Sequence, residues 1–147
     1  MDTPKEIIAA LFVPIEEKWI ESAMDFFKKG NRKLYYSTNA NIASIVKHAP
    51  KHIYFKISGN TEVKFIADFI DLVPGKLPPQ YYQYTLEGKD ILHDYKFSYG
   101  FSNLCRLKEF VQVADLKYFT NGNNLRNDVP GARIIIDPFP GFSPAII

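Results

Sequence analysis

The sequence predicts an α+β fold, a small and mostly antiparallel curved sheet or pseudobarrel with flanking helices. Only one long stretch, residues 16–29, spaces its apolar side chains by three and four as an amphipathic helix does, whereas several short stretches have the pattern of strands. The chain has 147 residues, 46% of them hydrophobic, which suffices for one ordinary core. We therefore expect a single domain, residues 1–147, with an irregular C-terminal tail at 139–147.

The chain is expected to open with a strand and the amphipathic helix. The continuous apolar run from Glu6 to Val13 is short enough for a strand buried on both faces, and Pro14 is expected to end it. The helix at 16–29 has acids in its first turn, lysines in its last turn and Gly30 directly after it. These end signals predict the bounds of the helix.

A second strand and a short helix are predicted next. Residues 32–37 have strand-forming character, and the polar residues that follow suit the start of a helix at about 40–47. Pro50 cannot continue that helix, so the chain is expected to turn there.

Residues 52–72 are predicted to form a hairpin with two different faces. The odd-numbered core face is expected to hold Ile53, Phe55, Ile57, Val63, Phe65, Ala67 and Phe69. Pairing these residues across the strands requires an odd number of loop residues, so we expect a three-residue loop, Gly59 to Thr61. On the even face we expect a helix contact at Ile66, Ile70 and Leu72. We also expect an open patch there, at Tyr54, Lys56 and Lys64.

The C-terminal half is predicted to hold shorter and less regular elements. Residues 73–84 carry three prolines and a glycine, which predicts a connection over the surface. Residues 91–113 predict one or two strands that meet at a bend or bulge at Gly100. A short helical turn at 115–119 and a last strand at 133–137 complete the expected order.

A run of cations beside aromatic residues is the best candidate for a binding surface. Lys28, Lys29, Arg32 and Lys33 precede two tyrosines and three small polar residues. Phosphates can meet the cations, while an unstacked base can lie on a tyrosine ring and have its edge read by serine or asparagine. The predicted nucleic-acid-binding residues are Arg32, Lys33, Tyr35, Tyr36, Ser37, Asn39, Tyr54 and Lys56. The alternative is a helix end whose lysines offset the macrodipole, followed by a strand with one buried tyrosine.

Two further groups of residues have both a functional and a structural interpretation. Tyr81, Tyr82 and Tyr84 follow the proline-rich connection, and they can form the wall of an aromatic pocket or cover the open end of a barrel. A second basic group, Lys47, His48, Lys51 and His52, lies close to the hairpin, where its histidines can contact a base or remain solvated.

Signatures of enzymes, metals and cofactors are missing from the sequence. The histidines lack the spacing of a zinc pair, and we find no phosphate-binding loop, nucleophile elbow or dinucleotide fingerprint. We therefore predict no catalytic residues, metal or cofactor. The single cysteine, Cys105, suits a reducing compartment, so we expect a cytoplasmic protein with neither a signal peptide nor a membrane span.

The order of elements resembles the PUA-like superfamily of small pseudobarrels, which includes the EVE and ASCH domains. The segment GNRKLYYSTNANIASIVKHAPKHIYFKIS resembles the family's path from a strand through a loop and short helix into a central hairpin. The later run LKEFVQVADLKYFTNGNNLRNDVPGARIIIDP is similar to its closing pattern. The resemblance implies non-catalytic binding of RNA or DNA, or of a modified base, in a cleft beside the sheet.

Two other functions remain open. A protein-interaction or assembly module, including a homodimer, would use the exposed tyrosines and the apolar tail at 139–147. An ASCH-like hydrolase of modified nucleosides would need Lys33 or Lys56 beside a carboxylate. The formal net charge of only +2 means that any nucleic-acid surface must be a local patch.

Overall fold

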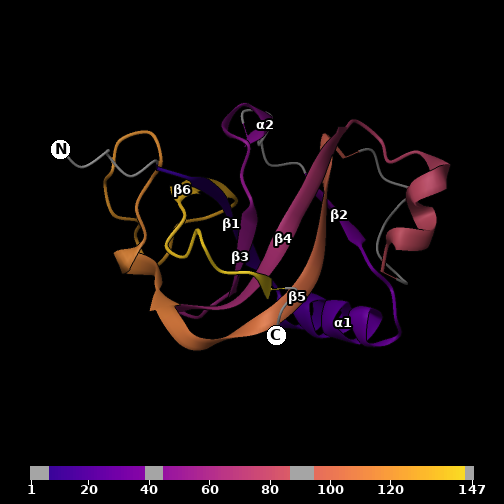
Figure 1. Ribbon diagram of the computed structural model, residues 1–147, viewed down its shortest axis with the longest axis horizontal. Helices are drawn as coiled ribbons and strands as arrows, with labels where there is room; N and C mark the ends of the chain where they lie inside the picture. Colours follow the sequence, from indigo (N-terminus) through magenta and orange to yellow (C-terminus); the bar gives the residue numbers. More distant parts are fainter. Residues whose placement is uncertain (1–6, 39–44, 87–94, 145–147) are drawn as a thin grey trace.

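The computed structural model describes residues 7–38, 45–86 and 95–144, which form one six-stranded sheet with few helices (Figure 1). The strands are β1 Ala9–Ile15, β2 Leu34–Thr38, β3 His52–Ile57, β4 Glu62–Pro74, β5 Phe97–Gln112 and β6 Arg133–Ile136. The helices are α1 Glu17–Lys28, α2 Ile45–His48 and two 3-10 turns, η1 Pro79–Tyr84 and η2 Val113–Asp115. The α+β class is confirmed.

The sheet is mixed and open rather than a closed barrel. Its strand order is β2-β5-β4-β3-β1-β6, so β2 and β6 are its edges in the described part of the chain. β1 runs parallel to β3, and the other neighbours are antiparallel. The chain therefore crosses from β1, near one edge, to β2 at the opposite edge, and α1 makes this crossing.

β1 continues through Pro14, contrary to the expectation that this proline would end it. The amide of Ser58 donates to the carbonyl of Ile15 at 2.8 Å, so the backbone N–H and C=O of Ile15 point toward β3. The backbone nitrogen of Pro14 therefore points to the other side. On that side β6 reaches only as far as Phe12, which pairs with Arg133. Pro14 is tolerated because its missing N–H faces no neighbouring strand.

The sheet has a hydrophobic core on each face. The first core includes Leu11, Val13, Ile53, Phe55, Phe65, Ala67, Tyr99 and Phe101, with Ile20 and Ala23 of α1. The second includes Ala10, Phe12, Tyr54, Val63, Ile66 and Ile135, with Val113, Leu116, Leu125 and Val129 from the chain after β5. In Figure 1, α1 lies at the lower right against β5, and the segment after β5 lies at the left.

The hairpin of β3 and β4 follows its predicted register over most of its length. Ile53 pairs with Ala67 and Phe55 with Phe65, so these residues share the first core. The predicted three-residue loop is wrong, because β3 ends at Ile57 and β4 begins at Glu62. Lys56 then pairs with Val63, which leaves Lys64 as the extra residue of a bulge and moves Val63 to the second core.

The predicted division of the even face is also wrong. Tyr54 is fully buried and Lys56 is 6% exposed, so neither belongs to an open patch. Ile66 packs in the second core and Ile70 is exposed, while α1 packs on the opposite face of the sheet. The reason is that the C-terminal segment, which alternation within the hairpin does not reveal, covers this face.

The connection after β4 covers the edge strand β2. Tyr81 and Tyr84 contact Tyr35 on one face of β2, whereas Leu86 joins the first core with Leu34 on the other face. The segment from η1 to Leu86 therefore wraps around this edge and protects it from pairing with another chain. The prediction of an irregular surface connection missed the regular turn η1.

The C-terminal segment differs from prediction at one turn. The 3-10 turn η2 precedes Leu116, and Lys117 and Tyr118 instead form isolated bridges to Asn124 and Ile135. The predicted helical turn at 115–119 is therefore wrong. The strand β6 is confirmed, and the tail is irregular as far as it is described.

Candidate functional site

The end of α1 and the connection to β2 form a ridge of positive charge. We call Lys28, Lys29, Arg32 and Lys33 the basic ridge; the first three side chains are exposed and Lys33 is half-buried. Gly30, with φ of +95°, donates its amide to the carbonyl of Phe27 and ends the helix. The side-chain amide of Asn31 donates from Nδ2 to the backbone carbonyl of Phe26 at 2.8 Å, and this hydrogen bond holds the connection against the helix.

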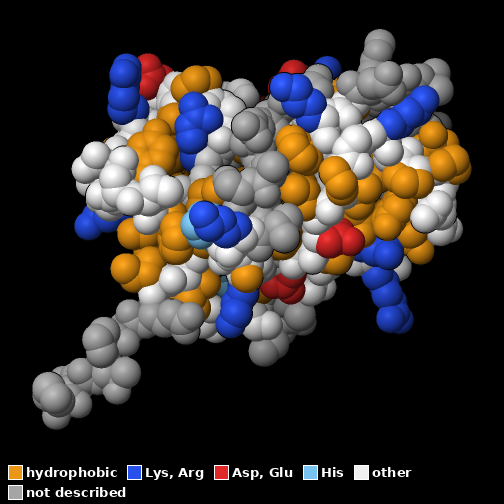
Figure 2. Space-filling model, turned by 90° about the horizontal axis from the view of Figure 1, so that it is seen from above, with side chains coloured by type: hydrophobic (Ala, Val, Ile, Leu, Met, Phe, Trp, Pro, Cys, Tyr) orange, Lys and Arg blue, Asp and Glu red, His pale blue; other side chains and the backbone are white. Residues whose placement is uncertain are grey.

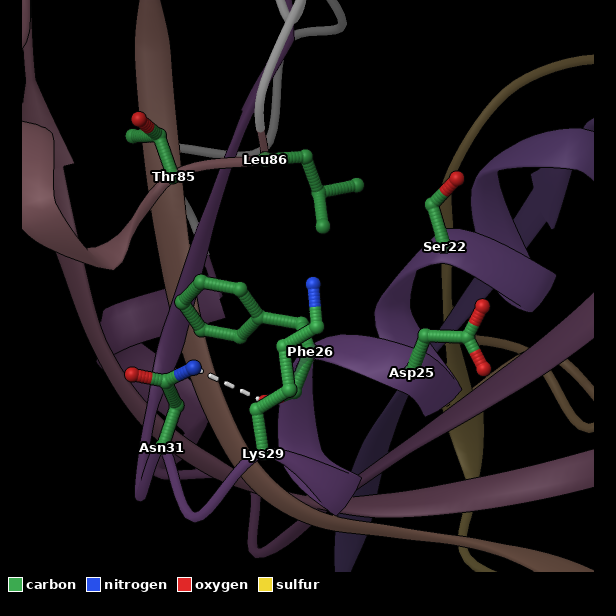
Figure 3. A pocket seen from close by; sticks show the side chains of 7 residues that line it. All are labelled: Ser22, Asp25, Phe26, Lys29, Asn31, Thr85 and Leu86. Atoms are coloured by element: carbon green, nitrogen blue, oxygen red, sulfur yellow. Dashed lines mark hydrogen bonds between the residues drawn. The ribbon is translucent and has the colours of Figure 1, made fainter.

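Two cavities lie on either side of the connection and share Asn31. One, of 480 Å³, is shown in Figure 3 and is lined by Ser22, Asp25, Phe26, Lys29, Asn31, Thr85 and Leu86. The other, of 460 Å³, is lined by Phe27, Asn31, Arg32, Ser102, Asn103 and Leu104. Both volumes are within the range of small-molecule sites, and each cavity carries one cation of the basic ridge.

Lys33 lies beside Tyr84 of η1 and Tyr35 of β2. The Lys33 ammonium lies 4.4 Å from the centre of the Tyr84 ring and 5.8 Å from that of Tyr35. The Tyr35 ring is 4.9 Å from Tyr81 and 6.5 Å from Tyr84. Figure 2 shows hydrophobic side chains, tyrosines included, gathered at the right, where Figure 1 has η1, with cationic side chains at the rim. We call Tyr35, Tyr81 and Tyr84 the tyrosine cluster.

Tyr35 is the buried base of this cluster. It is 2% exposed, so its ring cannot stack on a ligand as the sequence suggested. Its neighbours across the sheet are Gly100 on β5 and then Asp71 on β4. Burial, and next the Asp71 carboxylate, raise the pKa of the Tyr35 hydroxyl well above its ordinary value, so this hydroxyl stays protonated.

The structure separates the other residues of the predicted nucleic-acid surface. Tyr36 points to the opposite face, where its ring lies 5.7 Å from Tyr99. The buried hydroxyls of Ser37 and Ser98 share a hydrogen bond of 2.7 Å. Asn39 lies outside the described residues.

The two predicted residues of β3 are also unavailable to a ligand. Lys56 donates to the carbonyl of Asn127, and Tyr54 is buried beside the C-terminal segment. Lys33 stays beside Tyr84 near the surface, and the exposed Arg32 lines the cavity next to Asn103.

A buried polar network joins β3 to the turn after β6. Asp137, whose side chain is fully buried, accepts a hydrogen bond from the Tyr54 hydroxyl and shares one of 2.7 Å with Nδ1 of His52. The amide of Phe139 also donates to Asp137, at 2.9 Å. On the other side of His52, Nε2 lies 3.9 Å from the Asp68 carboxylate. We call His52, Tyr54 and Asp137 the buried triad.

The buried triad was missed by sequence reasoning because its members are far apart in the chain. His52 was noted only within a basic group, and Asp137 only as the end of a strand. The single available signal was an acidic residue directly after an apolar strand. Burial raises the pKa of the Tyr54 hydroxyl, and Asp137 raises it further, so Tyr54 remains a donor to the carboxylate.

The His52 side chain gives stability a predictable dependence on pH. Burial alone would lower its pKa, but the hydrogen bond and charge of Asp137, with smaller contributions from a backbone hydrogen bond to Phe142 and from the Asp68 carboxylate, raise the pKa above the ordinary 6.5. The stabilisation that protonated His52 contributes to the folded state is therefore complete below pH 6.5, and it is lost as the pH rises through the raised pKa. Urea unfolding of the wild type and His52→Gln should show a stability difference that shrinks over this range. A difference that does not change with pH would contradict this expectation.

Other candidates from the sequence have structural surroundings. Burial first, and the nearby Asp68 second, raise the pKa of the Cys105 thiol, which disfavours the reactive thiolate. The His48 ring packs 4.7 Å from Phe119, whereas His52 is buried, so the second basic group does not form one surface. Within the described residues, no cluster of histidine, cysteine and acidic side chains could hold a metal ion.

The chain matches no protein-family model, no curated protein and no solved structure. Its function is therefore inferred from the geometry of its own residues. None of the helices in the described ranges combines the length and the apolar character that crossing a membrane requires.

Proposed function

We propose that this protein is a small non-catalytic domain that binds a nucleic acid or a nucleotide, including one with a modified base. The observation that supports this proposal best is the position of the basic ridge between two cavities and beside the tyrosines of η1. Among the described residues, none of its four cations forms an ion pair. The Lys33 ammonium lies over the Tyr84 ring, so it is Lys28, Lys29 and Arg32 that offer their charge to a phosphate.

The proposed mechanism combines charge neutralisation with contacts to the base. Phosphates of the ligand lie along the basic ridge, and a base contacts the half-buried rings of Tyr82 or Tyr84. Tyr35 supports this surface from below instead of contacting the ligand, and Tyr54 and Lys56 take no part because they are buried. No covalent step is involved.

We also propose a distant relationship to the PUA-like proteins. The order of the elements supports it: an opening strand and helix, a central hairpin and a short closing strand follow one another as expected. The open sheet departs from a closed pseudobarrel. The proposed binding surface therefore rests on the residues of this chain and not on the family.

Salt dependence is the direct test of the proposed function. Binding of a fluorescent single-stranded oligonucleotide should weaken linearly on a plot of log affinity against log salt concentration. Arg32→Gln should reduce the slope by about one, and the double variant Lys28→Gln with Arg32→Gln by about two. The physical reason is that each cation that meets a phosphate releases counterions.

Lys117→Gln is the matched control, because Lys117 is an exposed lysine on the C-terminal segment. It removes the same charge and should leave the slope unchanged. Affinity that barely responds to salt would overturn the proposed role of the basic ridge. A change of slope in Lys117→Gln as large as that in Arg32→Gln would overturn it as well.

A second candidate function is an assembly module. The observation that favours it is an apolar cavity of 340 Å³ lined by Leu107, Lys108, Glu109, Phe139 and Phe142, where Phe139 is 38% exposed. Light scattering separates the two functions: a dimer that dissociates in Phe139→Ser but not in Ile70→Ser, another exposed apolar residue, supports assembly.

A hydrolase finds less support in the structure. It requires Lys33 or Lys56 beside a carboxylate, and neither lysine has such a neighbour within the described ranges. Lys33 instead lies over the Tyr84 ring, and Lys56 donates to a backbone carbonyl.

A further inference from the structure

The 480 Å³ cavity beside Lys29 has walls of two kinds. Phe26 and Leu86 supply apolar surface, whereas the polar groups come from Ser22, Asp25, Lys29, Asn31 and Thr85. In Figure 3, Ser22 and Asp25 lie on one side along α1, and Thr85 and Leu86 lie across from them. The ammonium of Lys29 points toward Leu86 past the Phe26 ring. A flat molecule with a polar edge fits such walls better than a bare anion does.

The hydroxyls in this cavity are committed as donors. The Ser22 hydroxyl donates to the carbonyl of Lys18 at 2.9 Å, and the Thr85 hydroxyl donates to the carbonyl of Tyr82 at 2.6 Å. Each hydroxyl therefore presents only lone pairs to a ligand. With the Asp25 carboxylate and the side-chain oxygen of Asn31, the cavity offers four side-chain groups that accept hydrogen bonds, against two that donate, the ammonium of Lys29 and the second amide N–H of Asn31.

We propose that this cavity takes an unpaired nucleobase that carries an exocyclic amino group. The amino group donates to the acceptors of the wall, a carbonyl or ring nitrogen of the base accepts from Lys29, and the ring packs against Phe26 and Leu86. Guanine fits best, because it presents three N–H donors on one edge and O6 beside them. This inference rests on the proposed function and adds the class of base that is bound.

The 480 Å³ cavity lies beside the basic ridge, so one nucleotide can occupy both. Lys29 lines the cavity, while Lys28 and Arg32 do not and remain available to a phosphate. A base held in the cavity thus places its own phosphate near the ridge. The cavity would supply base preference, and the ridge would supply affinity that depends on salt.

Titration calorimetry with nucleoside monophosphates tests the proposal. Guanosine monophosphate should bind about tenfold more tightly than inosine monophosphate, which differs only by lacking the amino group. Cytidine monophosphate should likewise bind more tightly than uridine monophosphate, and ribose 5-phosphate, which has no base, should bind most weakly. Thr85→Val removes one acceptor with little change of shape, so it should reduce the preference for guanosine over inosine monophosphate.

Lys29→Met and Lys28→Met form a matched pair for this test. Both remove one positive charge at the end of α1, so both should reduce the salt dependence of oligonucleotide binding by a similar amount. Both can weaken guanosine monophosphate binding through its phosphate, but Lys29→Met should weaken it about tenfold more than Lys28→Met does, because only Lys29 also contacts the base.

The outcomes separate this inference from the proposed function. Equal binding of guanosine and inosine monophosphates, or equal effects of the two lysine variants on them, would overturn the assignment of the cavity while salt-dependent oligonucleotide binding persists. Absence of binding to the oligonucleotide and to every nucleotide, at low salt, would overturn both.

Discussion

Replacing Asp137 with alanine is expected to lower the free energy of unfolding by about 3–5 kcal/mol. The Asp137 carboxylate is fully buried and is the acceptor for Tyr54, His52 and the amide of Phe139. Alanine would leave these groups buried without their partner, and a domain of this size has a total stability of only about 5–15 kcal/mol. Chemical denaturation followed by circular dichroism measures the loss.

The exposed carboxylate of Asp128 supplies the control for this prediction. It forms a 3.3 Å ion pair with Arg126 in which the Asp128 side chain is 73% exposed. Asp128→Ala should therefore change stability by less than about 1 kcal/mol. A loss of similar size in the two variants would contradict the expected contribution of the buried carboxylate to stability.

Gly100→Ala is expected to destabilise the protein by about 1–3 kcal/mol, although it adds only one methyl group. A Cβ at this position would lie 2.7 Å from Cε1 of Tyr35 and 2.8 Å from Oδ1 of Asp71. The Tyr35 ring cannot retreat easily, because Tyr81 and Tyr84 pack against it. Thermal unfolding and denaturant titration both measure this effect, and Gly100→Val should be worse still.

The proposed cause can be checked with a control and a double variant. Gly141→Ala adds the same methyl group where no atom lies within 4 Å, so it should be close to neutral. Combining Gly100→Ala with Tyr35→Leu should cost less than the sum of the single changes, because the smaller side chain relieves the contact. Strict additivity would indicate that the added methyl group acts by another route.

The close approach at Gly100 also links stability to the proposed binding surface. The tyrosine cluster rests on Tyr35, and Lys33 lies over the Tyr84 and Tyr35 rings. A shift of Tyr35 would therefore displace Lys33 and Tyr84 together. Gly100→Ala is thus expected to weaken oligonucleotide binding even though Gly100 lies beneath the site.

Sequence reasoning was most successful where a property depends on neighbours in the chain. The helix predicted at 16–29 is α1 to within one residue at each end, because apolar spacing and end signals are local. The core face of the hairpin was predicted correctly except at Val63, where the bulge at Lys64 changes the alternation. The four cations of the basic ridge lie within residues 28–33, so they stay near one another in the structure.

The candidate site was predicted only in part, because alternation shows which residues share a face but not what covers that face. Tyr54 and Lys56 were placed on a surface, yet the C-terminal segment buries both. Tyr35 and the tyrosines of η1 were predicted as separate groups, and the fold packs them into one cluster.

By itself, the sequence determined the α+β class, the amphipathic helix, one face of the central hairpin and the run of cations after the helix. Only the tertiary structure showed that His52 and Asp137, 85 residues apart, share a buried hydrogen bond, and that a cavity opens between α1 and Leu86. The physical reason is that helix and strand patterns arise from contacts a few residues apart. Burial of a charge, or the shape of a cavity, depends on segments that meet only when the sheet is assembled.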